Sequence, residues 1–551
     1  MRLACRTSIA RLTPLALIVL AVLPAQAAGA LTWSRTESVG ETGNLRPKGV
    51  HISARGDVLA LWQREEKEYG TATTHYAWRP PRGRWTANQQ LGGLMHSGWD
   101  VTVALTPRGQ ATALWADDGK VFAAEADLGG EFSKPQVIGR ADTCCATTLE
   151  VRVDDAGNAL AAWAGEQVQQ TEPGGSSGRN IYAATRTPKG EWSDPQLVRH
   201  GTGGFTSLAM NSAGAAVIGW AETQNMEPLI SYRPPAGRFG PAERVPSKYW
   251  GLPIVAIGES GEVVVATASR SHHVNEAVEA VMAVRQPTGE WSEPVSFPIA
   301  NAPSDLFVDP SGTATMFMTD SSDRDHPKAQ YVTRSRSGEV RGPTTVAGGR
   351  WWGDVAMNLR GDVLASLDQP GAELPFELVE RSAGQTFSPP RAAAGDTPTY
   401  GRVAINDAGQ AATVLAVGGL FNPKVQLAVR EDPALPVLPF PPIVEVDTRA
   451  EPGLDANGEL HLAVTCSTAC KATPKGILAA DGTGQLVAAD GSSKHIRAKK
   501  RGVVRLRFGS EQSRKVRRAI RDGRKPWLSV SVRARGRSPR PITVSRRIRL
   551  R

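Results

Sequence analysis

The sequence predicts an all-β protein: an eight-bladed β-propeller, with seven blades as the alternative, followed by a small β-sandwich. Glycine and proline are abundant, at 56 and 39 of 551 residues, which favours many short strands joined by tight turns. A strand–turn–strand frame recurs eight times with a period of about fifty residues, which is in the range of propeller blades. Charge divides the chain near residue 440, because residues 441–551 hold 25 Lys+Arg against 9 Asp+Glu, whereas the rest of the mature chain is acidic.

The N-terminus has the pattern of a signal peptide, residues 1–27. A basic start precedes an apolar run at 15–23, and Ala25-Gln26-Ala27 fits the small-x-small cleavage rule. We therefore expect a secreted, extracellular or cell-envelope protein with no transmembrane helix after cleavage. A retained N-terminal anchor is the alternative.

The frame is well represented by VRVDDAGNALAAW at 151–163. Asp154 and Asp155 could hold a metal, but Ser53–Ala54 and Asn211–Ser212 occupy the same place in other copies. A metal loop would not lose its ligands, whereas Asp, Asn and Ser side chains all suit turns. The turn needs a glycine with a positive φ, and the eight frame glycines are Gly56, Gly109, Gly157, Gly214, Gly261, Gly312, Gly361 and Gly409.

A second half-motif, as in IYAATRTPKGEWSDP (181–195), supplies two more strands to each copy. Repetition predicts structural roles for the arginine before its hairpin and for the tryptophan that ends the second strand of several frames. The arginines are Arg79, Arg186, Arg233, Arg285, Arg334 and Arg381; the tryptophans are Trp62, Trp115, Trp163 and Trp220.

The eighth copy lacks a fourth strand after 427–432. LTWSRTESVG at 31–40 matches the missing element, so we expect the N-terminal strand to close a propeller spanning 31–432. A seven-bladed ring with one displaced repeat is the alternative.

A Pro-rich linker, 433–442, leads to a basic domain at 443–551. Alternating strands predict a β-sandwich, and 513–523 predicts one short basic helix. In an oxidising compartment Cys466 and Cys470 are expected to form a disulfide, with a free pair as the alternative. Cys144 and Cys145 could form a strained vicinal disulfide or remain two buried thiols.

The repeats resemble secreted bacterial β-propeller proteins of the sialidase or BNR-like type, over about residues 31–435. The Asp-box of that family is not intact, since TPKGEW has one residue between Gly190 and Trp192. The family's catalytic set is not transferred, although Arg46 lies where its first arginine would fall. The C-terminal domain resembles the immunoglobulin-like modules of exported bacterial proteins, which implies a sandwich and no activity.

Propeller geometry places the variable connections on one face, where a ligand would bind. Aromatic and polar residues precede the innermost strands there, a combination that suits sugars. The predicted ligand-binding residues are Trp99, Asp100, Phe205, Trp250, Arg350, Trp351, Trp352, Tyr400 and Arg402. The alternative is that these aromatics pack between blades.

These observations favour a non-catalytic binding protein for an extracellular glycan or protein. A divergent sialidase-like exo-glycosidase is the first alternative, with Glu150, Asp305, Asp354 and Tyr400 as its candidate catalytic residues. A structural surface scaffold is the second.

The sequence gives weaker indications of partners and cofactors than of the fold. The basic domain could hold anionic cell-wall polymer; nucleic acid is not expected, and the protein is expected to be a monomer. No cofactor is expected, although Asp320, Asp323 and Asp325 could bind calcium on a loop that is more simply a solvated one.

Overall fold

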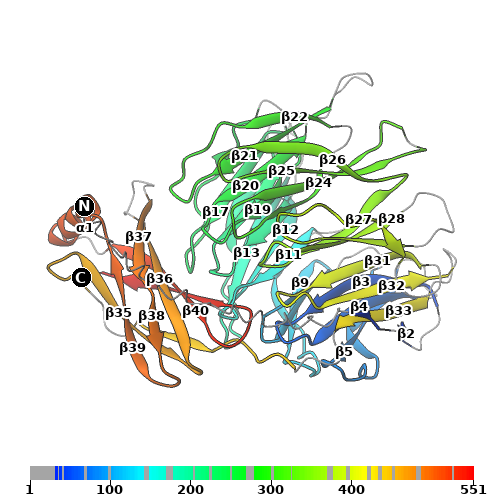
Figure 1. Ribbon diagram of the computed structural model, residues 1–551, viewed down its shortest axis with the longest axis horizontal. Helices are drawn as coiled ribbons and strands as arrows, with labels where there is room; N and C mark the ends of the chain where they lie inside the picture. The colour runs from blue at the N-terminus through cyan, green and yellow to red at the C-terminus, as the bar shows by residue number, and fades with distance from the viewer. Residues whose placement is uncertain are drawn as a thin grey trace, which may run out of the picture.

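A computed structural model shows an all-β chain of eight similar antiparallel sheets and a smaller C-terminal domain (Figure 1). The structure describes residues 32–550 except 35, 40–42, 67–70, 97–100, 142–147, 169–177, 203–204, 223–225, 248–250, 269–277, 300–302, 324, 369–375, 393–397, 419–423, 432–436, 449–452, 480–485 and 524–525. Within them no helix is long and apolar enough to cross a membrane.

Seven sheets have four consecutive strands each. Sheet 1 consists of β3 (Leu45–Ile52), β4 (Val58–Glu65), β5 (Thr71–Arg79) and β6 (Gln89–His96). Sheet 2 consists of β7 (Thr102–Leu105), β8 (Ala111–Asp117), β9 (Lys120–Ala126) and β10 (Gln136–Arg140). Sheet 3 consists of β11 (Leu149–Val153), β12 (Ala159–Val168), β13 (Gly178–Arg186) and β14 (Gln196–Thr202). Sheet 4 consists of β15 (Phe205–Met210), β16 (Ala216–Ala221), β17 (Pro228–Arg233) and β18 (Glu243–Arg244). Sheet 5 consists of β19 (Ile254–Ile257), β20 (Val263–Ala268), β21 (Val278–Arg285) and β22 (Val295–Ile299). Sheet 6 consists of β23 (Pro303–Val308), β24 (Ala314–Asp320), β25 (Lys328–Arg334) and β26 (Val340–Gly348). Sheet 7 consists of β27 (Trp351–Met357), β28 (Val363–Asp368), β29 (Glu377–Arg381) and β30 (Arg391–Ala392).

Sheet 8 combines the two ends of the repeat region. Its consecutive strands are β31 (Pro398–Ile405), β32 (Ala411–Val417) and β33 (Lys424–Glu431). The outer position beside β33 is occupied by β1 (Thr32–Trp33) and β2 (Glu37–Ser38), with Thr32 opposite Glu431 and Glu37 opposite Leu427. The N-terminal strand therefore pairs where the sequence predicted it. This arrangement of repeated sheets fits a β-propeller.

The frame turns confirm their predicted chemistry. All eight frame glycines have φ between +81° and +101°, a region that side chains disfavour. In seven of the eight frames, a short polar side chain three residues before the glycine caps the turn, and the fifth frame has Gly258 at that position. Asp154 accepts hydrogen bonds from the amides of Ala156 and Asn158 (2.9 and 2.8 Å), and Asn358 accepts them from Arg360 and Asp362 (2.9 and 3.0 Å). Asp154 is thus a turn residue, as predicted.

The repeated arginines join neighbouring sheets. Each reaches back to the preceding sheet in four cases: Arg186 to Glu125, Arg285 to Glu243 (2.6 Å), Arg334 to Ser292 (3.1 Å) and Arg381 to Thr315 (3.0 Å). Arg79 of sheet 1 pairs with Glu431 of sheet 8 at 2.7 Å, and Arg233 binds carbonyls of its own turns instead. The four frame tryptophans are buried, so both structural predictions are confirmed.

The C-terminal domain is one curled, eight-stranded sheet with a helix. Its elements are β34 (Val444–Asp447), β35 (Glu459–Cys466), β36 (Cys470–Ala479), β37 (Leu486–Ser492), β38 (Lys494–Ile496), β39 (Arg501–Arg507), α1 (Ser510–Arg521), β40 (Trp527–Arg535) and β41 (Ile542–Arg549). All eight strands hydrogen-bond in one sheet, and this pairing does not by itself show the predicted sandwich. The basic helix and the Cys466–Cys470 disulfide are present as predicted, while Cys144 and Cys145 lie outside the described residues.

Candidate functional site

A cavity of about 780 Å³ lies where the first strands of all eight sheets meet. Each first strand lies beside the first strand of the next sheet, and β31 of sheet 8 lies beside β3 of sheet 1. Because every first strand carries the same frame, one frame position supplies one ring of side chains around the cavity.

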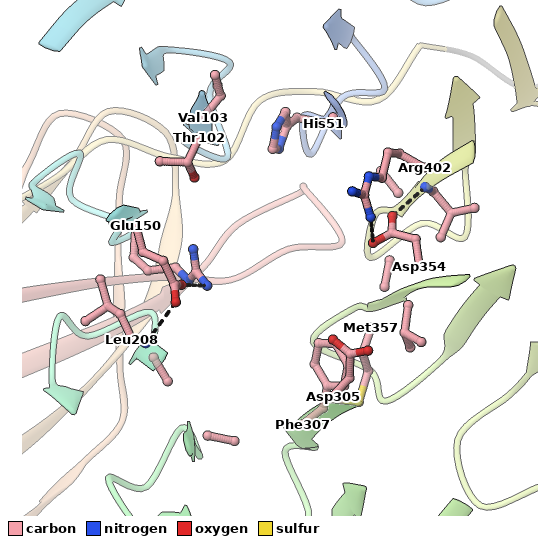
Figure 2. A pocket seen from close by; sticks show the side chains of 18 of the residues that line it. His51, Thr102, Val103, Glu150, Leu208, Asp305, Phe307, Asp354, Met357 and Arg402 are labelled. Atoms are coloured by element: carbon pink, nitrogen blue, oxygen red, sulfur yellow. Dashed lines mark hydrogen bonds and ion pairs between the residues drawn. The ribbon is translucent and has the colours of Figure 1, made fainter. Parts of the chain in front are cut away.

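The upper ring is polar in six of the eight sheets and differs from sheet to sheet. It comes from the residue seven positions before each frame glycine, and its members are Gly49, Thr102, Glu150, Ser207, Ile254, Asp305, Asp354 and Arg402. Figure 2 shows Glu150 on one side of the cavity and Asp354 with Arg402 across from it. Three predicted catalytic candidates and one predicted ligand-binding residue therefore lie in one ring.

The lower ring is apolar in every sheet. Four positions before the frame glycine stand Ile52, Leu105, Val153, Met210, Ile257, Val308, Met357 and Ile405. All eight side chains are partly exposed, and all except Val153 line the cavity. The cavity is therefore a cup with a polar rim and an aliphatic lower wall.

Two carboxylates of the upper ring bind the backbone of the next sheet. Glu150 accepts a hydrogen bond from the amide of Leu208 (3.2 Å), and Asp354 accepts one from the amide of Val403 (2.8 Å). Glu150 also pairs with Arg152, and Asp354 lies 3.6 Å from Arg402. Each of these carboxylates therefore has a structural partner before any ligand is considered.

Asp305, Asp354 and Asp368 form an acidic group near Arg402. Burial, and then the neighbouring Asp354 charge, raises the pKa of Asp305 to about 6. Burial likewise raises the pKa of Asp368 to about 6 and raises that of Asp354, although Arg402 opposes both shifts. Asp368 was not predicted, because it ends the second strand of its sheet, away from the frame position shared by the others.

His51 of sheet 1 and Arg152 of sheet 3 also line the cavity. Burial, and secondarily the charge of Arg152, lowers the pKa of His51 to about 4, so this imidazole is neutral at pH 7. The cavity therefore offers carboxylates on sheets 6 and 7 and a neutral imidazole on sheet 1. Such an arrangement suits a polar ligand that both donates and accepts hydrogen bonds.

The predicted aromatic platform is only partly found. Trp352 is a correction: it is 7% exposed and packs edge-on against Phe317, with its indole N–H donating to the carbonyl of Gln330 (2.8 Å). Its ring is therefore part of the core and is closed to a ligand. Trp351, the adjacent residue in β27, points to the other face of the strand and is half-buried.

The other predicted ligand-binding residues have mixed outcomes. Arg350 is held by Glu377 at 2.7 Å. Tyr400 is half-buried, and burial raises its pKa while Arg46 and Arg402 oppose the shift. Trp99, Asp100 and Trp250 lie outside the described residues, as does the side chain of Phe205.

The calcium candidates are engaged with their own loop. Asp320 accepts a hydrogen bond from the Ser322 hydroxyl (2.6 Å), and Asp323 lies 3.1 Å from His326. Among the residues that the structure describes, the metal-ligating side chains that gather are instead Asp455, Glu459 and His461 on the C-terminal domain.

The lower end of the cavity is covered by the C-terminal domain. The hairpin between β40 and β41 carries Arg540, which pairs with Asp155 of sheet 3 (2.9 Å) and Asp407 of sheet 8 (3.4 Å). Both carboxylates occupy the frame position two residues before the glycine, and both are almost fully buried. One arginine thus joins turns of two sheets that are far apart in the repeat order.

Further contacts fix this hairpin and the linker. The amide of Thr543 donates to Asp155 (2.9 Å), and Arg108 donates to the carbonyl of Pro441 (2.7 Å). The guanidinium groups of Arg55 and Arg108 lie 4.5 and 5.2 Å from the centre of the Phe440 ring. Asp155 therefore has a second role that the turn interpretation missed. The available signal was an acid at a position where the turn itself requires none, shared only with Glu259 and Asp407.

Comparison with known proteins yields no family for this chain. No protein-family model matches, and no curated protein matches. Among solved structures, a protein of unknown function from Dyadobacter fermentans is 11% identical, with 73% of this chain and 99% of that chain covered and a TM-score of 0.36. An acylaminoacyl peptidase from Pyrococcus horikoshii is 10% identical (68% and 57% covered, TM-score 0.38), and an α-L-arabinofuranosidase from Fusarium graminearum in complex with an iminosugar inhibitor is 11% identical (60% and 92% covered, TM-score 0.32). Similarity at this level carries no argument about activity.

Proposed function

We propose that the eight sheets are the blades of one closed propeller, completed by β1 and β2. The neighbouring positions of β31 and β3, and the Arg79–Glu431 pair between sheets 8 and 1, support closure. The proposal includes removal of residues 1–27 on export, a sialidase or BNR-like propeller and an immunoglobulin-like C-terminal module.

The function that we propose for this propeller is recognition of an extracellular glycan or protein without catalysis. The observation that carries the proposal is the upper ring, because one frame position holds eight mostly different side chains above an aliphatic lower ring that is apolar in all eight sheets. A repeated scaffold with a varied polar rim is suited to recognition. The hydrogen bonds that hold Glu150 and Asp354 to backbone amides favour positioning over proton transfer.

A glycan array probed with the full chain tests this function. We expect a defined subset of glycans to bind, and Arg402→Ala to reduce their binding at least tenfold because its exposed guanidinium lies on the rim. Arg537→Ala, an exposed arginine on the C-terminal hairpin, is the matched control and should bind as the wild type does. Equal binding by both variants would contradict a site at the rim.

A divergent glycoside hydrolase is the second candidate, and Asp305 favours it. A carboxyl group with a pKa of about 6 beside a second carboxyl group resembles a general acid paired with a base or nucleophile. A panel of fluorogenic glycosides tests it. Turnover that Asp305→Asn abolishes while glycan binding persists would establish this activity, whereas binding without turnover supports the first proposal; silence in both assays would leave a structural scaffold.

The basic C-terminal domain completes the proposal as the part that holds the protein near an anionic cell-wall polymer. Its exposed arginines on β39 and α1 support this location. Salt-dependent co-sedimentation with purified cell wall would test it.

A further inference from the structure

A second cavity, of about 330 Å³, lies between the eight-sheet body and the C-terminal domain. Its walls on the body come from the turns of sheets 4 to 6 and include Ala213, Pro235 and Pro287. Its walls on the C-terminal domain come from β36, β37 and β40 and include Ala489. The cavity is distinct from the central one, and both domains build it.

A buried hydroxyl group without a partner lies in the wall of this cavity. Tyr232 is 5% exposed, and its hydroxyl has no hydrogen-bond partner in the described part of the chain. A Cβ placed on Gly261, another wall residue, would lie 3.6 Å from that hydroxyl oxygen. An unpaired buried hydroxyl costs free energy, and a ligand that accepted its hydrogen bond would recover it.

Three cationic side chains reach the same cavity. Arg336 comes from the body, and Lys475 and Arg533 come from β36 and β40; all three are exposed and have no described ion pair. The single carboxylate of the wall, Glu259, already accepts hydrogen bonds from the amide and hydroxyl of Ser212. The cavity therefore combines apolar walls, one free donor and a net positive charge.

We propose that this cavity binds a small organic anion with an apolar body, such as an aromatic carboxylate. Its rings would lie against the proline and alanine side chains, and its carboxylate would lie among Arg336, Lys475 and Arg533. Because both domains contribute to the walls, binding would also stabilise their contact.

Isothermal titration calorimetry of the full chain with 2-naphthoate, and with the neutral 2-naphthamide, tests this proposal. We expect one saturable site for the anion and at least tenfold weaker binding of the amide. The charge-reversed double variant Lys475→Glu/Arg533→Glu should bind 2-naphthoate at least tenfold more weakly. The control is Lys471→Glu, an exposed lysine on the same face of β36 outside the cavity, which should bind normally.

The variant Tyr232→Phe distinguishes binding in this cavity from non-specific electrostatic attraction of anions. It keeps the ring and removes only the hydroxyl, so we expect three- to tenfold weaker binding and no loss of thermal stability. Three results would overturn the proposal: no heat of binding with 2-naphthoate, equal affinity for acid and amide, or equal effects of Lys471→Glu and the double variant.

Discussion

The two ends of the central cavity are built from the same repeat under opposite constraints. At the lower end, the residue three positions before the glycine caps its turn in seven of the eight frames, Gly258 being the exception, and Arg540 joins two turns to the C-terminal domain. At the upper end, the residue seven positions before the glycine ranges from Gly49 to Arg402, and the hydrogen bond to an amide of the next sheet is described for three of the eight, Glu150, Ser207 and Asp354. The repeats carry similar residues at the position that caps the turn, and they carry different residues at the upper-ring position. The varied end is therefore the one available for recognition.

Trp352→Ala is expected to have the largest effect, because Trp352 belongs to the core although it lies close to the upper rim. Loss of this buried ring should lower the free energy of unfolding by about 3–5 kcal/mol. Trp351→Ala, its half-buried neighbour, should cost about 1 kcal/mol or less. Urea unfolding followed by circular dichroism measures both losses. Similar losses for the two variants would contradict the assignment of Trp352 to the core.

Arg540→Glu should break the closed lower end. It leaves Asp155 and Asp407 buried and adds a third negative charge, so domain contact should weaken by about 3 kcal/mol. The linker should then become accessible to protease while each domain stays folded. Arg537→Glu, exposed in the same hairpin, should leave the digestion pattern unchanged; identical patterns for both variants would mean that Arg540 does not join the domains.

Asn358→Ala against Arg402→Ala compares a residue that caps a frame turn with a residue of the upper ring. Asn358 caps its turn and donates to the carbonyl of Asn406 in the next sheet (3.0 Å), so its loss should cost about 1–3 kcal/mol. Arg402 is exposed, and its loss should change stability by about 0.5 kcal/mol or less. A larger cost at Arg402 would show that the upper ring also carries the fold.

Asp305→Asn should give a small effect on stability that depends on pH. The folded-state pKa of Asp305, about 6, lies above the ordinary value of 3.8, so the folded protein binds this proton more tightly than the unfolded chain does. The stabilising contribution of the protonated form is complete below about pH 4 and is lost as the pH rises through 6. At pH 7 the variant should have a higher free energy of unfolding than the wild type, on the order of 1 kcal/mol because the side chain is only partly enclosed. At pH 4 the two proteins should be equally stable. Melting temperatures measured at both pH values check this expectation. A constant difference across this range would exclude a raised pKa.

Periodicity made much of the fold predictable. Glycine spacing locates turns because only a positive φ fits there, and the match between residues 31–40 and the missing strand located the pairing of β1. The same frame brought Glu150, Asp305, Asp354 and Arg402 together, because one frame position becomes one ring.

The remaining errors have physical causes. Two adjacent tryptophans point to opposite faces of a strand, and composition alone does not say which face is buried, so Trp352 was placed wrongly. Arg540 was missed because its carboxylate partners lie in distant turns, and no local pattern links them. Asp368 belongs to a different frame position from its neighbours in space.

The pairing of β1 with β33 also sets an order of events during synthesis. Thr32 is among the first residues of the described chain to leave the ribosome, yet its partner, Glu431, follows almost four hundred residues later. Sheet 8 therefore cannot be completed until the whole repeat region has left the ribosome, and the edge of β33 stays open until both ends meet. A chain of this design delays closure of sheet 8 until synthesis of the repeats is finished.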